Sequence, residues 1–500
     1  MKRRRNVFVL ILALAGVGVL ALMLSGGGAV SSAPSPTSDQ SDQEVDAAHA
    51  RGGEAEAEEE AQQAAERLEA WQQAKEAGTL RVNQAQVQAA AAPPAGWAGE
   101  QVISPTADDW EPAIAADPNS PYVYLLTTRY TGPTACGNKC PLPYIMLKVS
   151  SDGGVTWGPD RFICTCSRVG SQADPIIEVV PNTGAVYAVF MNGYNVVFTK
   201  STDHGATWST PVSTYGNVSW NDKPILATSD NGNDIYVSWN GPQNGDPYVA
   251  QSHNGGATWT QTRIVNSTRY FFAFDGDVLP NGTVVFSETS LDYGGPGGAL
   301  VGQAQVNVLR STNSGGSFTS NLVDTVELAP DCTAAGCPAD YYPGHTAITA
   351  DSAGTLVLLY DGATVSKGNE TIWSRRSTNG GATWSARQAL STAGEMADFP
   401  AAEARGAGDV RAWYMQTNGG NFDAWNVWYR ASTNGGSSWG APVKISDVTA
   451  GATYKTANGF LEPYGDYGEA AITNTGKFIG IWGEGNSYTG PGGAWINRQT

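Results

Sequence analysis

Short runs of alternating apolar and polar residues recur along the chain from about residue 99 to residue 500. Runs such as 123–126, 235–239 and 478–482 are rich in β-branched and aromatic side chains. Runs of this length and composition are typical of β-strands rather than helices, because alternate side chains of a strand point to opposite faces of a sheet. The pattern therefore predicts an all-β fold built from many short strands.

A recurrent pattern precedes these runs and is expected to begin a strand. It consists of an acidic residue that usually has Pro or Gly nearby. Seven such starts follow one another along the chain, and one of them departs from the pattern because His345 replaces the acid. The acidic residues at the other six starts are Glu111, Asp174, Asp222, Asp275, Asp398 and Asp466. Seven similar strand starts predict seven similar sheets.

A second pattern, Ser-x-(Asp/Asn)-x-Gly-x-(Thr/Ser)-aromatic, occurs six times. Its copies begin at steps of 51, 51, 59, 66 and 55 residues, with the first residues Ser150, Ser201, Ser252, Ser311, Ser377 and Ser432. Recurrence at this spacing indicates a repeat architecture. The Asp or Asn accepts backbone hydrogen bonds and the Gly tolerates a positive φ, so each copy predicts a hairpin turn. We interpret this repeat motif as fold-stabilising, with its aromatic residue plugging the gap between adjacent sheets.

The six copies resemble the Asp box, also called the bacterial neuraminidase repeat, over about residues 99–500. Asp boxes mark sialidases, and also sortilin-type receptors, some xyloglucan hydrolases and various assembly factors. The resemblance implies a β-propeller of the sialidase superfamily, built of four-stranded blades. The box is then expected between the third and fourth strands of a blade.

Seven strand starts and six boxes are compatible if both ends of the chain complete one blade. After Asp466 the chain has room for three strands, the last of them at Ala494–Arg498. The missing fourth strand is expected at Glu100–Ile103, whose surroundings resemble the segment that follows each box. We therefore predict seven blades, with six as the alternative, in a ring that leaves no exposed edge.

The first 98 residues differ in composition from the repeats. Lys2–Arg5 precedes the uncharged apolar stretch Val7–Leu24, so residues 1–25 are expected to be a retained signal-anchor. A cleaved signal peptide that ends near Ser31–Ala33 is the alternative. Residues 26–98 are expected to form an acidic stalk, partly disordered and partly helical, that ends in an Ala/Pro linker. The propeller is thus expected outside the cytoplasm, secreted or anchored by one transmembrane segment.

The charge and the cysteines narrow the environment further. The formal net charge of −18 argues against binding of nucleic acid or anionic membranes by the folded part. Six cysteines fit an oxidising compartment, and Cys332 and Cys337 are close enough in sequence for a local bridge. Two further disulfides, whose pairing the sequence leaves open, are expected among Cys136, Cys140, Cys164 and Cys166. A four-cysteine zinc site is the alternative.

The first strand of each propeller blade lines the central channel, so the six strand-start acids are expected to converge at one mouth. Clustered carboxyl groups suit acid/base catalysis, because like charges push their pKa values apart, and two of them can hydrolyse a glycosidic bond. They can also hold Ca²⁺, the one cofactor considered, or cap their own strand starts by accepting backbone N–H bonds. Aromatic residues expected near this mouth suit sugar stacking or core packing, namely Tyr130, Trp239, Trp413, Tyr467 and Trp482.

The resemblance to sialidases implies further roles. Sialidases hold the substrate carboxylate with three arginines and use a Tyr, activated by a Glu, as nucleophile. Tyr467, followed by Glu469, lies where that nucleophile is expected, and Arg129 and Arg269 are the plausible channel arginines. The first blade opens with Trp110-Glu111-Pro112, without the arginine that sialidases carry there.

Two functions follow from these residues. The first is a glycan-active glycoside hydrolase of the exo-sialidase type, with the candidate catalytic residues Asp275, Tyr467, Glu469 and Glu111. The candidate binding residues are Asp174, Asp222, Asp398, Asp466, Arg129, Arg269 and Trp239. The second is a non-catalytic binding propeller or scaffold, whose ligand is a glycan or an extracellular protein.

Overall fold

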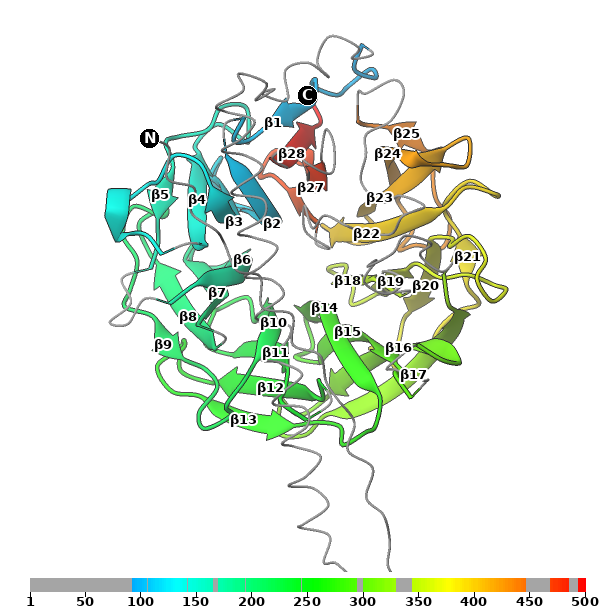
Figure 1. Ribbon diagram of the computed structural model, residues 1–500, viewed down its shortest axis with the longest axis horizontal. Coiled ribbons are helices and arrows are strands. Elements are labelled where there is room, and N and C mark those ends of the chain that lie inside the picture. The colour runs from blue at the N-terminus through cyan, green and yellow to red at the C-terminus, as the bar shows by residue number, and fades with distance from the viewer. Residues whose placement is uncertain are drawn as a thin grey trace, which may run out of the picture. The chain divides into compact units, whose positions relative to one another are not determined.

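The central feature of the computed structural model is a ring of antiparallel sheets. The structure describes residues 92–105, 107–141, 143–164, 170–193, 195–243, 245–294, 300–329, 344–446, 468–484 and 493–500. These residues form seven four-stranded sheets arranged as blades around a central axis (Figure 1), which confirms the predicted seven-bladed all-β propeller. The first strand of each blade lies nearest the axis.

Six blades consist of four consecutive strands, and the seventh joins strands from both ends of the propeller. Blades 1 to 3 are formed by β2 (Asp108–Ala116), β3 (Val123–Thr131), β4 (Tyr144–Ser150) and β5 (Arg161–Phe162); β6 (Gln172–Val179), β7 (Val186–Asn192), β8 (Val196–Ser201) and β9 (Val212–Ser213); and β10 (Asp222–Thr228), β11 (Ile235–Asn240), β12 (Pro247–Ser252) and β13 (Thr260–Arg263). Blades 4 to 6 are formed by β14 (Tyr270–Val278), β15 (Val284–Leu291), β16 (Gln303–Ser311) and β17 (Thr319–Glu327); β18 (Thr346–Ala350), β19 (Leu356–Tyr360), β20 (Trp373–Ser377) and β21 (Gln388–Ala389); and β22 (Ala397–Ala404), β23 (Val410–Asn418), β24 (Asn421–Ser432) and β25 (Val443–Lys444). Blade 7 is formed by β26 (Glu469–Ile472), β27 (Phe478–Glu484), β28 (Gly493–Arg498) and β1 (Gln101–Val102).

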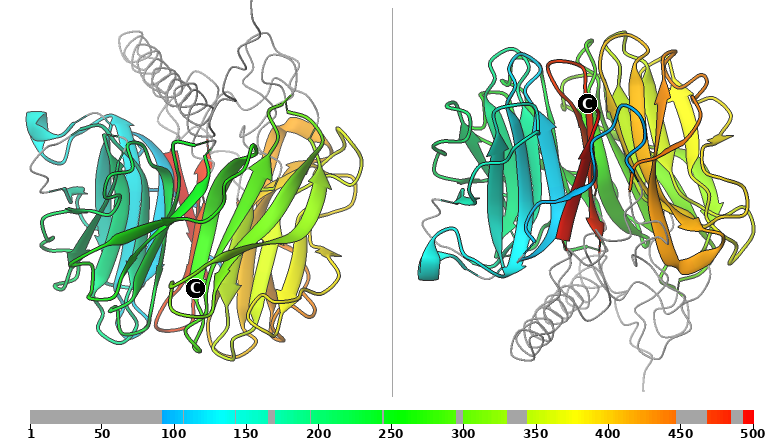
Figure 2. Two further views of the ribbon diagram at one scale, coloured as in Figure 1. Left: turned by 90° about the horizontal axis from the view of Figure 1, so that it is seen from below. Right: turned by 90° about the horizontal axis from the view of Figure 1, so that it is seen from above.

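Blade 7 closes the ring. Strand β1 pairs antiparallel with β28, with Gln101 opposite Ile496 and Val102 opposite Trp495. Figure 2 shows the red strands of this blade between the first blade and the sixth. The predicted fourth strand at Glu100–Ile103 is therefore confirmed, and pairing of the two terminal strands leaves no gap in the ring.

The six repeat motifs have one common geometry. The Ser of each copy is the last residue of a third strand, and its Oγ accepts the N–H of the motif Gly at 2.9–3.0 Å, as Ser150 does from Gly154. The Asp or Asn Oδ1 accepts the N–H of the motif Thr or Ser at 2.8–3.0 Å, as Asp152 does from Thr156. The motif Gly has a φ of 73–83°, which favours glycine. These local bonds turn the chain from the third strand to the fourth.

The hydrophobic core is divided into clusters that lie between neighbouring blades. One cluster joins Leu126 of blade 1 to Phe190 of blade 2, and the motif aromatic Trp208 of blade 2 packs against it. The motif aromatics of the other blades occupy equivalent positions, for example Trp259 between blades 2 and 3 and Trp439 between blades 5 and 6. The repeat motif therefore anchors each blade to the blade before it, as its aromatic residue predicts.

Blade 7 lacks a continuous copy of the motif, and the two chain ends meet where it would lie. Trp97 stands four residues before β1, just as Trp157 stands four residues before β5 in blade 1. The N–H of Ala98 donates to the carbonyl of Arg498 at 2.9 Å, and the N–H of Gly158 makes the matching 2.9 Å bond in blade 1. The aromatic half of a seventh motif is thus supplied by Trp97.

Five of the seven first strands shift register against the second strand, and four of them share a bulge that the sequence pattern does not reveal. In each of these four, the residue before a proline has a positive φ of 48–54°, and the pairing with the second strand shifts register there. These residues are Glu111, Asp174, Lys223 and Phe399. A left-handed conformation costs a non-glycine residue about 1–2 kcal/mol. The strand-start acids consequently occupy two different positions relative to the bulge.

The described cysteines form disulfides. Cys136 and Cys140 are bridged locally, with 5.5 Å between their Cα atoms, on either side of the 3-10 turn η1 (Gly137–Lys139). This bridge uses two of the four cysteines of the alternative zinc site, which is therefore not formed. Cys164 is also disulfide-bonded, whereas Cys166, Cys332 and Cys337 lie outside the described residues.

The predicted membrane segment cannot be compared with the fold. Val7–Leu24 and the rest of residues 1–91 lie outside the described ranges. Within those ranges, no helix has the length and apolar character needed to cross a membrane.

Candidate functional site

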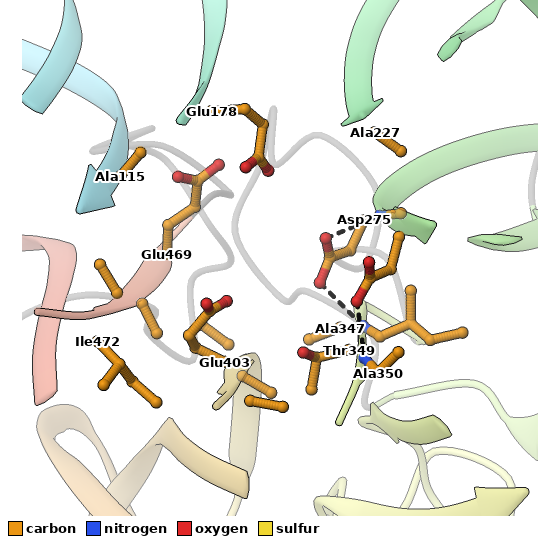
Figure 3. A pocket seen from close by; sticks show the side chains of 18 of the residues that line it. Ala115, Glu178, Ala227, Asp275, Ala347, Thr349, Ala350, Glu403, Glu469 and Ile472 are labelled. Atoms are coloured by element: carbon orange, nitrogen blue, oxygen red, sulfur yellow. Dashed lines mark hydrogen bonds between the residues drawn. The ribbon is translucent and has the colours of Figure 1, made fainter. Parts of the chain in front are cut away.

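A cavity of about 540 Å³ occupies the central channel. It is lined by the first strands of the blades and by turns that follow them, such as those at Pro118, Pro181 and Pro280. Five acidic side chains of the first strands line it, namely Glu178, Asp275, Asp277, Glu403 and Glu469. Figure 3 shows Glu178, Asp275, Glu403 and Glu469 pointing into this space from four different blades.

Strand alternation explains why these side chains share the cavity. Asp275 and Asp277 are two residues apart on β14, so both point to the same face of the strand. Glu178 is the penultimate residue of β6 and Glu403 the penultimate residue of β22. Glu469 opens β26. The seven strands converge on one axis, and the channel face of each strand therefore contributes to a single acidic lining.

Three of the five carboxylates accept backbone N–H groups from the next blade. Asp275 Oδ2 accepts the N–H of Ile348 at 2.9 Å, and Asp277 Oδ2 accepts that of Ala350 at 2.7 Å. Glu469 Oε2 accepts the N–H of Ile114 at 2.6 Å, which connects blade 7 to blade 1. Asp275 also accepts the N–H of Gly276 on its own strand at 2.7 Å, so this strand-start acid makes a local bond as well as a bond to the next blade.

Glu178 and Glu403 differ from the other three. Within the described part of the chain, neither carboxylate accepts a hydrogen bond or forms an ion pair, and both line the cavity. Burial, and then the charges of Asp277 and Asp275, raise the pKa of Glu178 to about 8. Burial, and then the charge of Glu178, raise the pKa of Glu403 well above its ordinary range. A carboxyl group with such a pKa keeps its proton at neutral pH.

Burial also raises the pKa of the three bonded acids, and it does so to different extents. It raises the pKa of Asp275 to about 8 and that of Asp277 to about 6, against the opposing effect of the N–H donors of Ile348 and Ala350. It raises the pKa of Glu469 well above its ordinary range, again opposed by a backbone N–H. At neutral pH the cavity therefore contains both protonated and ionised carboxyl groups.

The structure brings two of the sequence-predicted catalytic residues together, since Asp275 and Glu469 both line the cavity. Glu111 is not among the lining residues, and its Oε2 accepts the Thr128 hydroxyl at 2.5 Å and the N–H of Asp174 at 3.0 Å. Tyr467 lies outside the described residues.

The strand-start binding candidates lie beside the channel wall rather than in the cavity. Asp174, Asp222 and Asp398 are buried and are not among the lining residues. Asp174 has the positive φ of the bulge itself, whereas Asp222 and Asp398 are the residues immediately before the bulge. Asp466 lies outside the described residues.

The predicted channel arginines are not in the channel. The buried Arg129 forms a two-pronged ion pair with Asp109, at 2.7 and 2.8 Å, and also contacts Asp160. Arg269 donates to the hydroxyl and carbonyl of Ser290, at 3.0 and 2.8 Å. Both side chains serve the fold, so the expectation that they face a substrate is corrected.

The expected aromatic mouth is also corrected. Trp239 is fully buried in the core between blades 2 and 3, where its ring stacks against Tyr248. Tyr130, Trp413 and Trp482 are likewise buried and do not line the cavity. Among the described residues, the aromatic ring that lines the cavity belongs to Phe274, and the fifth expected aromatic residue, Tyr467, lies outside them.

Sequence reasoning missed Glu178, Asp277 and Glu403, and also Arg405, which lines the cavity at the turn after β22. Asp277 was detectable, because it lies two residues after Asp275 on a predicted strand. Glu178 and Glu403 follow apolar runs at the far end of their strands, where the strand-start signature gives no indication of an acid.

A second acidic group lies outside the channel. Among the described residues, the carboxylates close enough together to share one ion are those of Asp361, Glu370 and Asp398, whose ligand atoms lie within 4.8 Å of one another. All three are buried, and Asp361 accepts the backbone N–H groups of Gly344, His345 and Phe399. Asp398, one of the strand-start acids, belongs to this group, and Ca²⁺ binding stays a prediction.

Comparisons with known proteins support the fold. No family model matches the sequence, and no curated protein sequence is significantly similar to it. Among solved structures, an ulvan lyase of a new polysaccharide lyase family matches with 10% identity and a TM-score of 0.50, over 80% of this chain and 95% of that chain. A protein of unknown function from Dyadobacter fermentans matches with 13% identity and a TM-score of 0.46, over 81% and 99% of the two chains.

The NanB sialidase from Streptococcus pneumoniae matches with 12% identity and a TM-score of 0.41, over 81% of this chain and 70% of that chain. At these identities the likeness concerns the fold alone. The chain is a seven-bladed β-propeller, the fold that its repeat motif predicts.

Proposed function

We propose that this protein is an exported, glycan-acting propeller that hydrolyses a glycosidic bond in its central channel. The observation that carries the proposal is the channel cavity, which is lined by carboxyl groups with separated pKa values. Its volume of about 540 Å³ lies within the range of small-molecule sites, roughly 300–1,000 Å³. Two carboxyl groups held in different protonation states are the usual requirement of glycoside hydrolysis.

Asp275 and Asp277 fit the two roles. With a pKa of about 8, Asp275 is protonated at neutral pH and donates the proton to the leaving oxygen. With a pKa of about 6, Asp277 is ionised and activates a water molecule. Their Cα atoms are separated by about two strand residues, roughly 7 Å, and an inverting mechanism needs space for that water between the carboxyl groups. Glu469 faces the same space from blade 7.

The test is turnover of fluorogenic neutral glycosides and sialosides across pH 4–10. We expect activity that rises through about pH 6, as Asp277 ionises, and falls through about pH 8, as Asp275 loses its proton. Asp275→Asn and Asp277→Asn should abolish turnover, whereas Glu327→Gln on the outermost strand β17 should preserve it. Absence of turnover of both the neutral glycosides and the sialosides would overturn the proposal.

An exo-sialidase reaction has less support than hydrolysis of an uncharged glycan. A substrate carboxylate needs fixed cationic donors, and Arg405 is the one arginine among the described residues that line the cavity. Its guanidinium donates to the backbone carbonyls of Thr473 and Asn474, the latter at 3.1 Å. Turnover of the sialosides in the same assay tests directly whether the protein is an exo-sialidase.

A second candidate function is a non-catalytic binding propeller, and the bonds between blades favour it. Asp275, Asp277 and Glu469 each stabilise the neighbouring blade, as a structural carboxylate does. If binding is the whole function, Asp275→Asn lowers the free energy of unfolding and no turnover exists to be lost. An activity that disappears while the fold stays intact would contradict this alternative.

The export proposal is supported by the sequence of residues 2–24 and by the disulfide between Cys136 and Cys140. We propose that residues 1–25 remain as an anchor. Alkaline extraction of membranes, followed by N-terminal sequencing, tests this directly. Retention of the first residues in the membrane fraction is expected, and a mature protein that begins after Ala33 would instead show a cleaved signal.

A further inference from the structure

The cavity contains acids without cationic partners. Of its lining residues in the described part of the chain, seven are acidic, five of them on the first strands, and Arg405 alone is basic. That guanidinium donates to backbone carbonyls of blade 7 rather than to a cavity carboxylate. No cationic side chain of the described residues therefore compensates Glu178 and Glu403, and their ionisation at neutral pH needs a ligand that supplies a positive charge.

Glu178 and Glu403 point most directly to that ligand. Both side chains are half-buried, and they line the cavity from blades 2 and 6. Neither accepts a hydrogen bond from a described residue, in contrast to Asp275, Asp277 and Glu469. Two half-buried acceptors that line the same cavity are suited to a donor group placed between them.

The dimensions favour an organic cation over a metal ion. Among the described residues, the three-carboxylate set that lies within 4.8 Å is Asp361, Glu370 and Asp398, and none of these lines the cavity. The channel acids are thus more widely spaced than the ligands of one ion, and the cavity of about 540 Å³ is far larger than an ion requires. An ammonium group on a larger molecule satisfies both conditions.

We propose that the channel selects glycans that carry a free amino group, with Glu178 and Glu403 as the acceptors of the ammonium group. The proposal rests on the glycan-acting function proposed above and names its substrate class. An N-acetylated sugar lacks the charge and has one amide donor. A sialylated or sulfated sugar brings a negative charge into an acidic channel and is disfavoured.

Calorimetric titration with two trimers of the same length, one of glucosamine and one of N-acetylglucosamine, tests the proposal. We expect the amine trimer to bind at least tenfold more tightly to the wild-type protein. The double variant Glu178→Gln/Glu403→Gln should lose this preference, whereas Glu327→Gln, which also removes one negative charge, should keep it. Circular dichroism and tryptophan fluorescence show whether each variant is folded.

A second readout distinguishes an ammonium at Glu178 from attraction to the acidic surface in general. At pH 7 the pKa of about 8 leaves Glu178 protonated in the free protein, so binding of an ammonium must release a proton. Titration in buffers with different ionisation heats measures that proton, and the double variant should release less. Equal binding of the two trimers, or an amine preference that persists in the double variant, overturns the proposal.

The outcome is separable from the hydrolysis test. Amine-selective binding without turnover would support the ligand class and contradict hydrolysis. Turnover of neutral glycosides without amine selectivity would support hydrolysis and contradict the proposed ligand class.

Discussion

Replacement of Glu178 by Gln should stabilise the fold, and more so at high pH. Glu178 is half-buried, lines the channel and accepts no hydrogen bond from a described residue. In the folded protein it keeps its proton up to about pH 8, whereas in the unfolded chain it loses the proton near its ordinary pKa of 4.5. Between these values the folded protein binds the extra proton, so the free energy of unfolding falls as the pH rises. Gln has the same shape and removes this dependence.

The magnitude follows from the pKa of Glu178. At about 1.4 kcal/mol per pH unit, a rise from 4.5 to about 8 corresponds to a penalty of about 5 kcal/mol above pH 8, and to about 1 kcal/mol or less at pH 5. Water that enters the cavity screens part of this penalty. We therefore expect Glu178→Gln to gain about 2–4 kcal/mol relative to wild type between pH 5 and pH 9.

Urea unfolding at pH 5, 7 and 9, followed by tryptophan fluorescence, measures the effect. The buried Trp239, Trp413 and Trp482 report on the loss of the fold. Glu327→Gln, on an outermost strand, should shift the midpoint equally at all three pH values. If the difference between Glu178→Gln and wild type is the same at pH 5 and pH 9, the raised pKa of Glu178 and the reasoning built on it are wrong.

Three further predictions concern the fold, and urea unfolding measures each. Arg129→Met should lower the free energy of unfolding by about 3–5 kcal/mol, because it leaves the charge of Asp109 buried and uncompensated. Addition of Asp109→Leu should recover much of this stability. Full stability of the single variant would contradict the importance of the buried pair. Trp97→Ala should cost about 3–5 kcal/mol, as for other buried aromatics, and a loss below about 1 kcal/mol would show that the closing blade does not depend on it. Asn379→Ala removes hydrogen bonds to Thr383 at an exposed turn. It should lower the free energy of unfolding by about 1–2 kcal/mol and leave the pH dependence of stability unchanged.

The fold was predictable because its main signal is local. Each repeat motif forms its hydrogen bonds within eight residues, from Ser150 to Trp157 in the first copy, so the sequence contains the whole turn. Counting strand starts against motifs then located the closing strand β1. Trp97 escaped notice because the other half of its motif lies about 400 residues away in sequence, and only the folded ring brings Trp97 beside Arg498.

The site was predictable only in part, because it depends on backbone conformations that the sequence does not show. A residue before proline usually avoids the left-handed region, yet Glu111 and Asp174 adopt it. The resulting bulges turn these acids from the cavity, while Glu178 enters it from the far end of β6. Arg129 failed as a channel residue for a different reason, since its buried partner Asp109 lies on the neighbouring strand.

The junction at blade 7 has a consequence for how the chain can be ordered. It is a repeat motif divided between Trp97 and Arg498, and the ring tolerates the break because strand pairing and aromatic packing hold both halves in place. The six continuous motifs are equivalent turns with exposed tips, so each is a position at which a circularly permuted chain can begin. A protein whose old ends are joined by a short linker, and which opens at Asn434 instead, should assemble the same ring.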